Sequence, residues 1–439
     1  MKKILFVLVI LFLLILTALG LFLFFGGNKN AVSDFFDANN DFGAFFDTNS
    51  QSQNDTVLDS EIPTDQTTTE SKFVAPVLRQ LSFEPVSGFT FYATTSTSTR
   101  ESSAGVEEFL ATSTVVRFQE RATGHLFDVF EFIPTPEKVS NITVQKVYNT
   151  IFTNNTNEFL EQTTTFNNEQ ITTTFAKNIP AQQIGTSTPQ EQQLDQKNIS
   201  TTISDFTFIK PLNKLLYSIP KTNGSDIYTS DTQRNKEVLL SNIPFSEFNL
   251  EPINNTHALL QTKASATSVG YAYTLNLSTG DLSKFIGNIP GLLTKVSPNL
   301  QYYIYAESDQ NRPIIRAYDV TNKTTRRIGL DTLPEKCVFS EKNIDQAYCF
   351  GSLQYKSALY PDDWYKGKVF NNEDLYRINL STGVVDVIYV FIEENDSVDA
   401  KTFDVIKPLL TFDDNFIVFQ NKNDLTLWSI HLEALNNQF

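Results

Sequence analysis

The fold is decided by a short stretch that recurs along the second half of the chain and first reads Tyr273-Thr-Leu-Asn276-Leu-Ser-Thr-Gly280. It returns as Arg316-Ala-Tyr-Asp319-Val-Thr-Asn-Lys323 and again as Tyr376-Arg-Ile-Asn379-Leu-Ser-Thr-Gly383. Each copy reads as the third strand of a small unit and ends in Asn or Asp before a polar turn. A small four-stranded sheet cannot bury both of its faces alone, so such units must stack against copies of themselves.

The spacing of polar turns predicts the number of units. Between Pro211 and Glu341 the first turns of successive units come about 42 to 45 residues apart, the period of a four-stranded propeller blade. An earlier unit is expected to turn near Val86-Ser-Gly88, which gives seven units, with six and eight as alternatives. Residues 73–439 are therefore predicted to form an all-β, seven-bladed β-propeller. Wider gaps predict insertions, which fall near Thr94–Ser103, Asn178–Lys197 and Lys356–Phe370.

The last unit predicts how the ring closes. The stretch Leu425–Leu432 aligns with Asp374–Leu380, so His431 takes the place of Asn379, and too few residues follow for a fourth strand. A polar group that stabilises the turn is the favoured role of His431. The missing strand is expected to be Val77–Leu81, which would complete the last blade and protect its open edge.

The N-terminus predicts a membrane anchor. Lys2 and Lys3 precede an uncharged, mainly apolar run from Ile4 to Phe25, long enough as a helix to cross the roughly 30 Å hydrocarbon layer. The positive-inside rule makes residues 1–3 a cytoplasmic tip, so the chain is predicted to be a single-pass protein of the cell membrane with its C-terminal domain outside. A cleaved signal peptide is the alternative. Residues 26–72 form a polar acidic linker of disordered composition.

The net charge of the chain argues against one class of partner, and its two cysteines predict a disulfide bond. The chain has 34 Lys plus Arg against 50 Asp plus Glu, a net charge of −16, which argues against nucleic acid as a partner. The two cysteines, Cys337 and Cys349, flank a predicted hairpin centred near Asn343 that would set them opposite one another. Export to an oxidising compartment favours a disulfide, and two free, half-buried thiols are the alternative.

The repeat residues also carry a family resemblance. Ser297-Pro-Asn299, Tyr302–Ala306, Tyr318-Asp-Val320 and Thr325–Ile328 resemble the WD40-like repeats of TolB-type propellers. Further segments resemble uncharacterised membrane-anchored propeller proteins of candidate-phylum bacteria with small genomes: Leu78–Leu81, Glu84–Gly88, Ala122–His125, Asn288–Gly291, Leu333–Cys337, Tyr360–Tyr365 and Asn421–Trp428. The resemblance implies a propeller fold and an exported location, and it implies no activity.

Motifs for catalysis or metal binding are not recognisable in the sequence. His125, His257 and His431 stand alone, and neither a nucleophile elbow, a Walker loop nor a metal-ligand spacing is present. The candidate for partner contact is an aromatic and acidic insertion that comprises Tyr360, Asp362, Asp363, Trp364 and Tyr365. The alternative is that Trp364 and Tyr365 fold back and cap their own blade.

The sequence therefore favours a non-enzymatic, membrane-tethered propeller that binds or scaffolds an envelope protein or glycan. No cofactor or metal is predicted. A hydrolase or lyase that acts on envelope polysaccharide through acidic residues at the mouth of the ring is the first alternative, recognisable by two carboxylates about 5 to 10 Å apart in a deep pocket. A purely structural envelope component is the second.

Overall fold

The computed structural model describes residues 76–102, 105–131, 133–164, 171–179, 193–199, 203–309, 312–391 and 401–436. The chain divides into two compact units, Met1–Glu70 and Ser71–Phe439, and all described residues belong to the second. The predicted membrane helix over 4–25 and the linker over 26–72 lie outside the described residues. Within the described part of the chain, no helix is both long and apolar enough to cross a bilayer.

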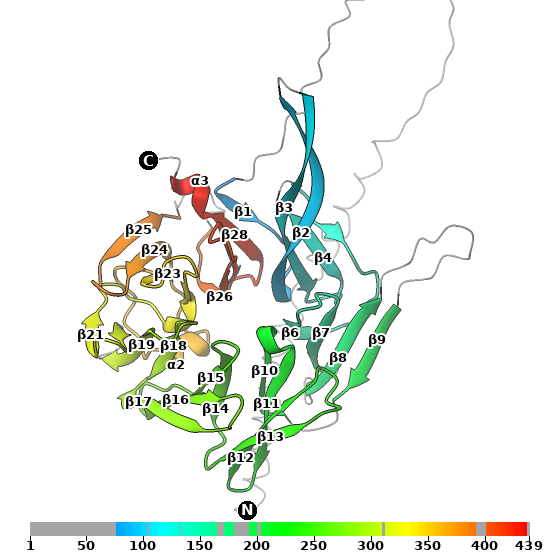
Figure 1. The fold of residues 1–439 in the computed structure, drawn as a ribbon. Coiled ribbons are helices and arrows are strands. Elements are labelled where there is room, and N and C mark those ends of the chain that lie inside the picture. Colours follow the sequence, from blue (N-terminus) through cyan, green and yellow to red (C-terminus); the bar gives the residue numbers. More distant parts are fainter. Residues whose placement is uncertain are drawn as a thin grey trace, which may run out of the picture. The chain divides into compact units, whose positions relative to one another are not determined.

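The predicted all-β propeller is confirmed for the part of the chain that the structure describes. Its strands form seven antiparallel four-stranded sheets, or blades, arranged around a ring (Figure 1). Blade 1 contains β2 (Val86–Ser102), β3 (Gly105–Glu120), β4 (Leu126–Phe130) and β5 (Glu137–Lys138). Blade 2 contains β6 (Val147–Phe152), β7 (Glu158–Thr164), β8 (Ile171–Ile179) and β9 (Gln193–Asn198). Blade 3 contains β10 (Asp205–Ile209), β11 (Lys214–Lys221), β12 (Gly224–Ser230) and β13 (Val238–Ile243), with the 3-10 helix η2 (Lys210–Leu212) after β10.

The remaining blades repeat this order. Blade 4 contains β14 (Phe248–Pro252), β15 (His257–Thr262), β16 (Val269–Asn276) and β17 (Leu282–Pro290). Blade 5 contains β18 (Leu293–Val296), β19 (Tyr302–Asp309), β20 (Arg312–Asp319) and β21 (Thr324–Arg327). Blade 6 contains β22 (Cys337–Phe339), β23 (Gln346–Gly351), β24 (Asp374–Asn379) and β25 (Val385–Tyr389), with η3 (Pro334–Lys336) before β22 and α2 (Asp362–Tyr365) between β23 and β24. Blade 7 contains β26 (Val405–Leu410), β27 (Phe416–Asn421), β28 (Leu427–His431) and β1 (Leu78–Gln80), and α3 (Leu432–Asn436) follows β28.

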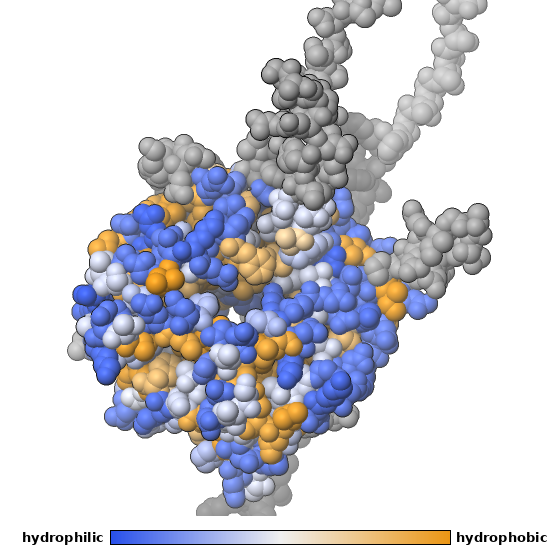
Figure 2. Space-filling model, viewed as in Figure 1, coloured by the Kyte–Doolittle hydropathy of each residue, from blue (hydrophilic) through white to orange (hydrophobic). Residues whose placement is uncertain are grey.

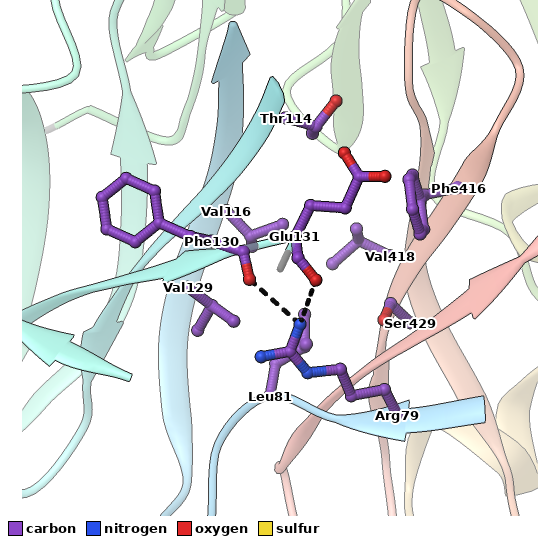
Figure 3. A pocket seen from close by; sticks show the side chains of 10 residues that line it. All are labelled: Arg79, Leu81, Thr114, Val116, Val129, Phe130, Glu131, Phe416, Val418 and Ser429. Carbon is purple, nitrogen blue, oxygen red and sulfur yellow. Dashed lines mark hydrogen bonds between the residues drawn. The ribbon is translucent and has the colours of Figure 1, made fainter. Parts of the chain in front are cut away.

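The predicted closure of the ring is confirmed. Strand β1 pairs antiparallel with β28, and Leu78 lies opposite Ile430. Figure 3 shows how Arg79 of β1 then reaches blade 1, where its guanidinium donates to the carbonyl oxygens of Phe130 at 3.0 Å and Glu131 at 3.1 Å. The N-terminal strand therefore joins the last blade by its backbone and the first blade by a side chain.

The recurring Asn and Asp stabilise turns, as the repeat predicts. Strands β16, β20 and β24 end at Asn276, Asp319 and Asn379. The Oδ1 atom of Asn379 accepts hydrogen bonds from the backbone N–H groups of Ser381 and Thr382 at 3.1 and 2.9 Å, which satisfies the donors of the turn. His431 departs from the pattern, because its ring stacks on Phe416 with 4.4 Å between centroids. The expected turn-stabilising role of His431 is therefore wrong.

Blade 1 also departs from its predicted layout. Val86–Gly88 is not a turn but the start of β2, which has 17 residues and pairs with the 16 residues of β3. Strand β2 includes Thr94–Ser102 of the predicted insertion, and Ser103 lies outside the described residues. A register shift between Val86 and Gly88 marks a β-bulge. Glycine is required there, because a Cβ on Gly88 would lie 2.0 Å from the carbonyl oxygen of Thr150 in blade 2.

Candidate functional site

A channel passes between the first strands of several blades. Its cavity encloses about 330 Å³, and Figure 2 shows an opening at the centre of the ring. The residues that line it come from β2, β6 and β26, from the two 3-10 helices and from β18; they include Thr90, Asn149, Lys210, Lys295, Glu335 and Lys407. A ligand in this channel would therefore contact side chains from most blades at once.

The insertion predicted as a partner contact folds back against the ring. Helix α2 places Asp362, Asp363, Trp364 and Tyr365 close together, after Tyr360. The side chains of Tyr360 and Trp364 are buried, with 1% and 2% of their surface exposed. Direct contact of these two rings with a partner is therefore ruled out in this structure, which is a correction to the expectation from the sequence.

Trp364 is buried because its indole belongs to an ionic cluster. Its Nε1 donates to both carboxylate oxygens of Asp404 at 2.9 Å. The ammonium group of Lys336 lies 2.5 Å from Glu373 Oε1 and 2.5 Å from Asp404 Oδ1, and 4.4 Å from the centroid of the Trp364 ring. The side chains of Lys336, Glu373 and Asp404 have no exposed surface. We call these four residues, with Tyr355, the buried ionic cluster.

Electrostatics within the buried ionic cluster are set by desolvation. Burial raises the pKa of the Glu373 carboxyl, and Lys336 opposes this shift because it favours the charged form. The Tyr355 hydroxyl donates a hydrogen bond to Glu373, and burial raises the pKa of Tyr355 well above its ordinary value. Glu373 and Asp404 are thus two carboxylates on one cation, but a substrate has no access to them.

The remaining residues of the insertion tie it to neighbouring blades. The Asp362 carboxylate accepts hydrogen bonds from Ser265 Oγ at 3.0 Å and from the backbone N–H of Ala266 at 2.6 Å, both between β15 and β16 of blade 4. Asp363 forms an ion pair of 3.0 Å with Lys368.

Tyr365 of the insertion stays accessible, as does Phe370 at its end. The side chain of Tyr365 is half exposed, and its hydroxyl donates to Glu335 Oε2 at 2.6 Å. Glu335 lines the channel, and burial raises the pKa of its carboxyl. The insertion therefore borders the channel through the pair of Tyr365 and Glu335.

The two cysteines lie opposite one another in β22 and β23 and form a disulfide with an S–S distance of 2.06 Å. The hairpin between them turns at Asn343, whose carbonyl oxygen accepts from the N–H of Gln346 at 3.0 Å. The disulfide fixes the start of blade 6 directly after Lys336, so it stiffens the chain next to the buried ionic cluster.

The three histidines contact different neighbours and do not form a common site. His125 Nε2 lies 3.1 Å from Thr143 Oγ1, and His257 Nδ1 lies 2.8 Å from Thr256 Oγ1. Across the described residues, no three His, Cys, Asp or Glu side chains converge in a way that could hold a metal ion.

Sequence reasoning missed the buried ionic cluster and the lysines of the channel. Lys336 follows Leu333-Pro-Glu, a segment quoted only for its family resemblance, and Asp404 lies in another blade. The usable signal was the combination of a tryptophan with a carboxylate-rich insertion, which is equally typical of an exposed contact and of a buried network.

The fold defines the chain as a seven-bladed β-propeller of four-stranded blades. No protein-family model matches the sequence, and no curated protein matches it. Solved structures with a similar fold include an oligogalacturonate lyase in complex with manganese, at 9% identity and a TM-score of 0.44, covering 80% of this chain and 99% of that chain. TolB from Acinetobacter baumannii matches at 12% identity and a TM-score of 0.36, covering 78% and 79%. Hydrazine synthase of Kuenenia stuttgartiensis matches at 9% identity and a TM-score of 0.42, covering 66% and 77%. Similarities at this level carry no argument about activity.

Proposed function

We propose that this chain is a membrane-tethered, extracytoplasmic propeller that binds an envelope protein or glycan at the mouth of its central channel. In this proposal the tether is the apolar run Ile4–Phe25, and the polar residues 26–72 link it to the ring. The observation that supports binding at the mouth is the half-exposed Tyr365, hydrogen-bonded to the channel residue Glu335.

An aromatic ring at the rim of a channel suits both kinds of partner. Tyrosine supplies a flat apolar face for a side chain or a sugar ring, and its hydroxyl gives a polar handle. The rim is also rigid, because Asp362 binds blade 4 and the Trp364 indole binds Asp404. Binding at a rigid rim costs little ordering of the protein, which favours affinity.

The binding proposal is tested by comparing Tyr365→Ala with Phe83→Ala. Phe83 is 76% exposed and lies outside the insertion and the channel lining, so it is a matched aromatic control. Proximity labelling from a ligase fused to the C-terminus in intact cells reports protein neighbours, and co-sedimentation with isolated envelope polysaccharide reports glycan binding. We expect Tyr365→Ala to lose labelled neighbours or sedimentation while Phe83→Ala keeps them. Equal signals from both variants would refute binding at the rim.

The tether is tested separately. Alkaline carbonate should leave the full chain in the membrane pellet, and protease added to intact spheroplasts should digest residues 73–439. Release into the soluble fraction would contradict an uncleaved anchor, and protection from protease would contradict the extracytoplasmic location.

A further inference from the structure

Two lysines reach into the central channel without a carboxylate partner. Lys210 lies in η2 of blade 3, and its Nζ donates to Thr90 Oγ1 of blade 1 at 3.0 Å. Lys407 lies in β26 of blade 7, and its Nζ donates to Asn149 Oδ1 of blade 2 at 3.3 Å. Among the described residues neither lysine forms an ion pair, whereas the third lysine of the channel, Lys295, has Glu251 at 3.7 Å.

The backbone at Lys407 is held in a conformation that lysine rarely adopts. Its φ is 51°, in the left-handed region, and the register of β26 against β27 shifts between Ile406 and Leu409. A β-bulge of this kind turns a side chain away from its regular direction. A non-glycine residue in this region stores strain, and such strain is concentrated at functional positions.

Both side chains are exposed where they line the channel. Desolvation by the surrounding protein lowers the pKa of Lys210 and of Lys407. The one carboxylate in the channel lining, Glu335, accepts the hydroxyl of Tyr365. The channel thus holds positive charge without a counter-ion in a chain whose net charge is −16.

We propose that the central channel binds a small oxyanion, a carboxylate or phosphate group, through the ammonium groups of Lys210 and Lys407. The hydroxyl of Thr90 accepts from Lys210 and so keeps its own proton for the anion. Charge-assisted hydrogen bonds are shorter and stronger than those between neutral groups. The anion site names the chemical group that the channel would bind, and it therefore rests on the proposed binding function. Its residues differ from those of the rim.

The test is isothermal titration calorimetry of the purified full chain, in detergent, with citrate in one arm and inorganic phosphate in the other. The variants are Lys210→Gln, Lys407→Gln and the double variant. Lys342→Gln, on the exposed turn between β22 and β23, is the control because it changes net charge equally. We expect each channel variant to weaken binding about tenfold, since a hydrogen bond to a charged group is lost, and the control to leave it unchanged.

The calorimetry can support or overturn the anion site. Binding of citrate alone, of phosphate alone or of both, with the tenfold losses, supports the site and identifies the group it takes. The absence of binding of both anions, or losses no larger than that of Lys342→Gln, overturns the site. The two proposals can fail separately. If Tyr365→Ala loses its partner but the wild-type chain binds neither anion, only the channel site is refuted. If the wild-type chain binds citrate but Tyr365→Ala keeps all its partners, only binding at the rim is refuted.

Discussion

Removal of the Lys336 charge is expected to destabilise the ring strongly. In Lys336→Met the carboxylates of Glu373 and Asp404 lose the ammonium group that each contacts at 2.5 Å, while their side chains stay fully buried. Breaking a buried ion pair on one side costs about 3 to 5 kcal/mol, because the charge that remains is uncompensated. For a domain of this size, that loss corresponds to a fall in melting temperature of about 4 to 6 °C.

The assay is thermal and denaturant unfolding, compared with Lys342→Met. Lys342 is exposed, and its substitution should change the free energy of unfolding by no more than about 0.5 kcal/mol. The triple variant Lys336→Met, Glu373→Gln, Asp404→Asn should recover most of the loss, since no uncompensated charge remains. If Lys336→Met lost no more stability than Lys342→Met, the cluster would be solvated and the reasoning refuted.

The pH dependence gives a second check on the same variant. Burial already raises the pKa of Glu373 above its ordinary value of 4.5, and loss of Lys336 removes an effect that lowers it. A carboxyl with a raised folded-state pKa favours the folded state at low pH and loses that contribution as pH rises. The loss caused by Lys336→Met should therefore be smaller at about pH 5 than at about pH 7.5, and a loss that grows on acidification would contradict this cause.

Three further predictions follow from the closure, the disulfide and a buried carboxyl. Deletion of residues 73–82 removes β1 from blade 7 and should abolish cooperative thermal unfolding; an unchanged transition would contradict closure by this strand. Replacement of both Cys337 and Cys349 by Ser should cost about 3 kcal/mol in denaturant unfolding by the chain-entropy model, and two alkylated thiols in the unreduced protein would argue against the bond. Burial raises the pKa of Asp205 from 3.8 to about 6, so the stability it contributes is present below 3.8 and lost as pH rises through about 6. Asp205→Asn should therefore gain stability relative to the wild type as pH rises from about 4 to 8, and a constant difference would contradict the shift.

The features predicted correctly from the sequence are those set by local chemistry. Asn379 binds the backbone of the two residues that follow Leu380, and this requirement can be read within a few positions of the chain. The closing strand could be inferred because a blade that ends at Leu432 leaves an edge unpaired. Val86–Gly88 was misassigned because β2 and β3, of 17 and 16 residues, are longer than the other described strands, which displaces the turn from its expected place.

The features that were missed depend on contacts between distant residues. Trp364 was judged by its neighbours Asp362 and Asp363, but its burial is decided by Asp404 of blade 7 and by Lys336 of η3. An aromatic residue next to acidic residues in the sequence can belong to an exposed contact surface or to a buried network of hydrogen bonds. The difference is one buried cation, and the sequence does not show which lysine is buried.

The channel lysines could not be predicted from the sequence for the same reason, and they matter most for function. Lys210 and Lys407 each belong to a blade of their own, and in a linear repeat each reads as an ordinary solvated side chain. Closure of the ring brings residues of β2, β6, β18, β26 and the two 3-10 helices together, so positions that are unrelated in sequence become neighbours in one cavity. A propeller can therefore change its channel charge by single substitutions in separate blades without altering the turns that define its fold. It follows that ligand chemistry in this protein should be sought in the residues by which its blades differ, such as the strained Lys407, rather than in the Asn and Asp residues that they share.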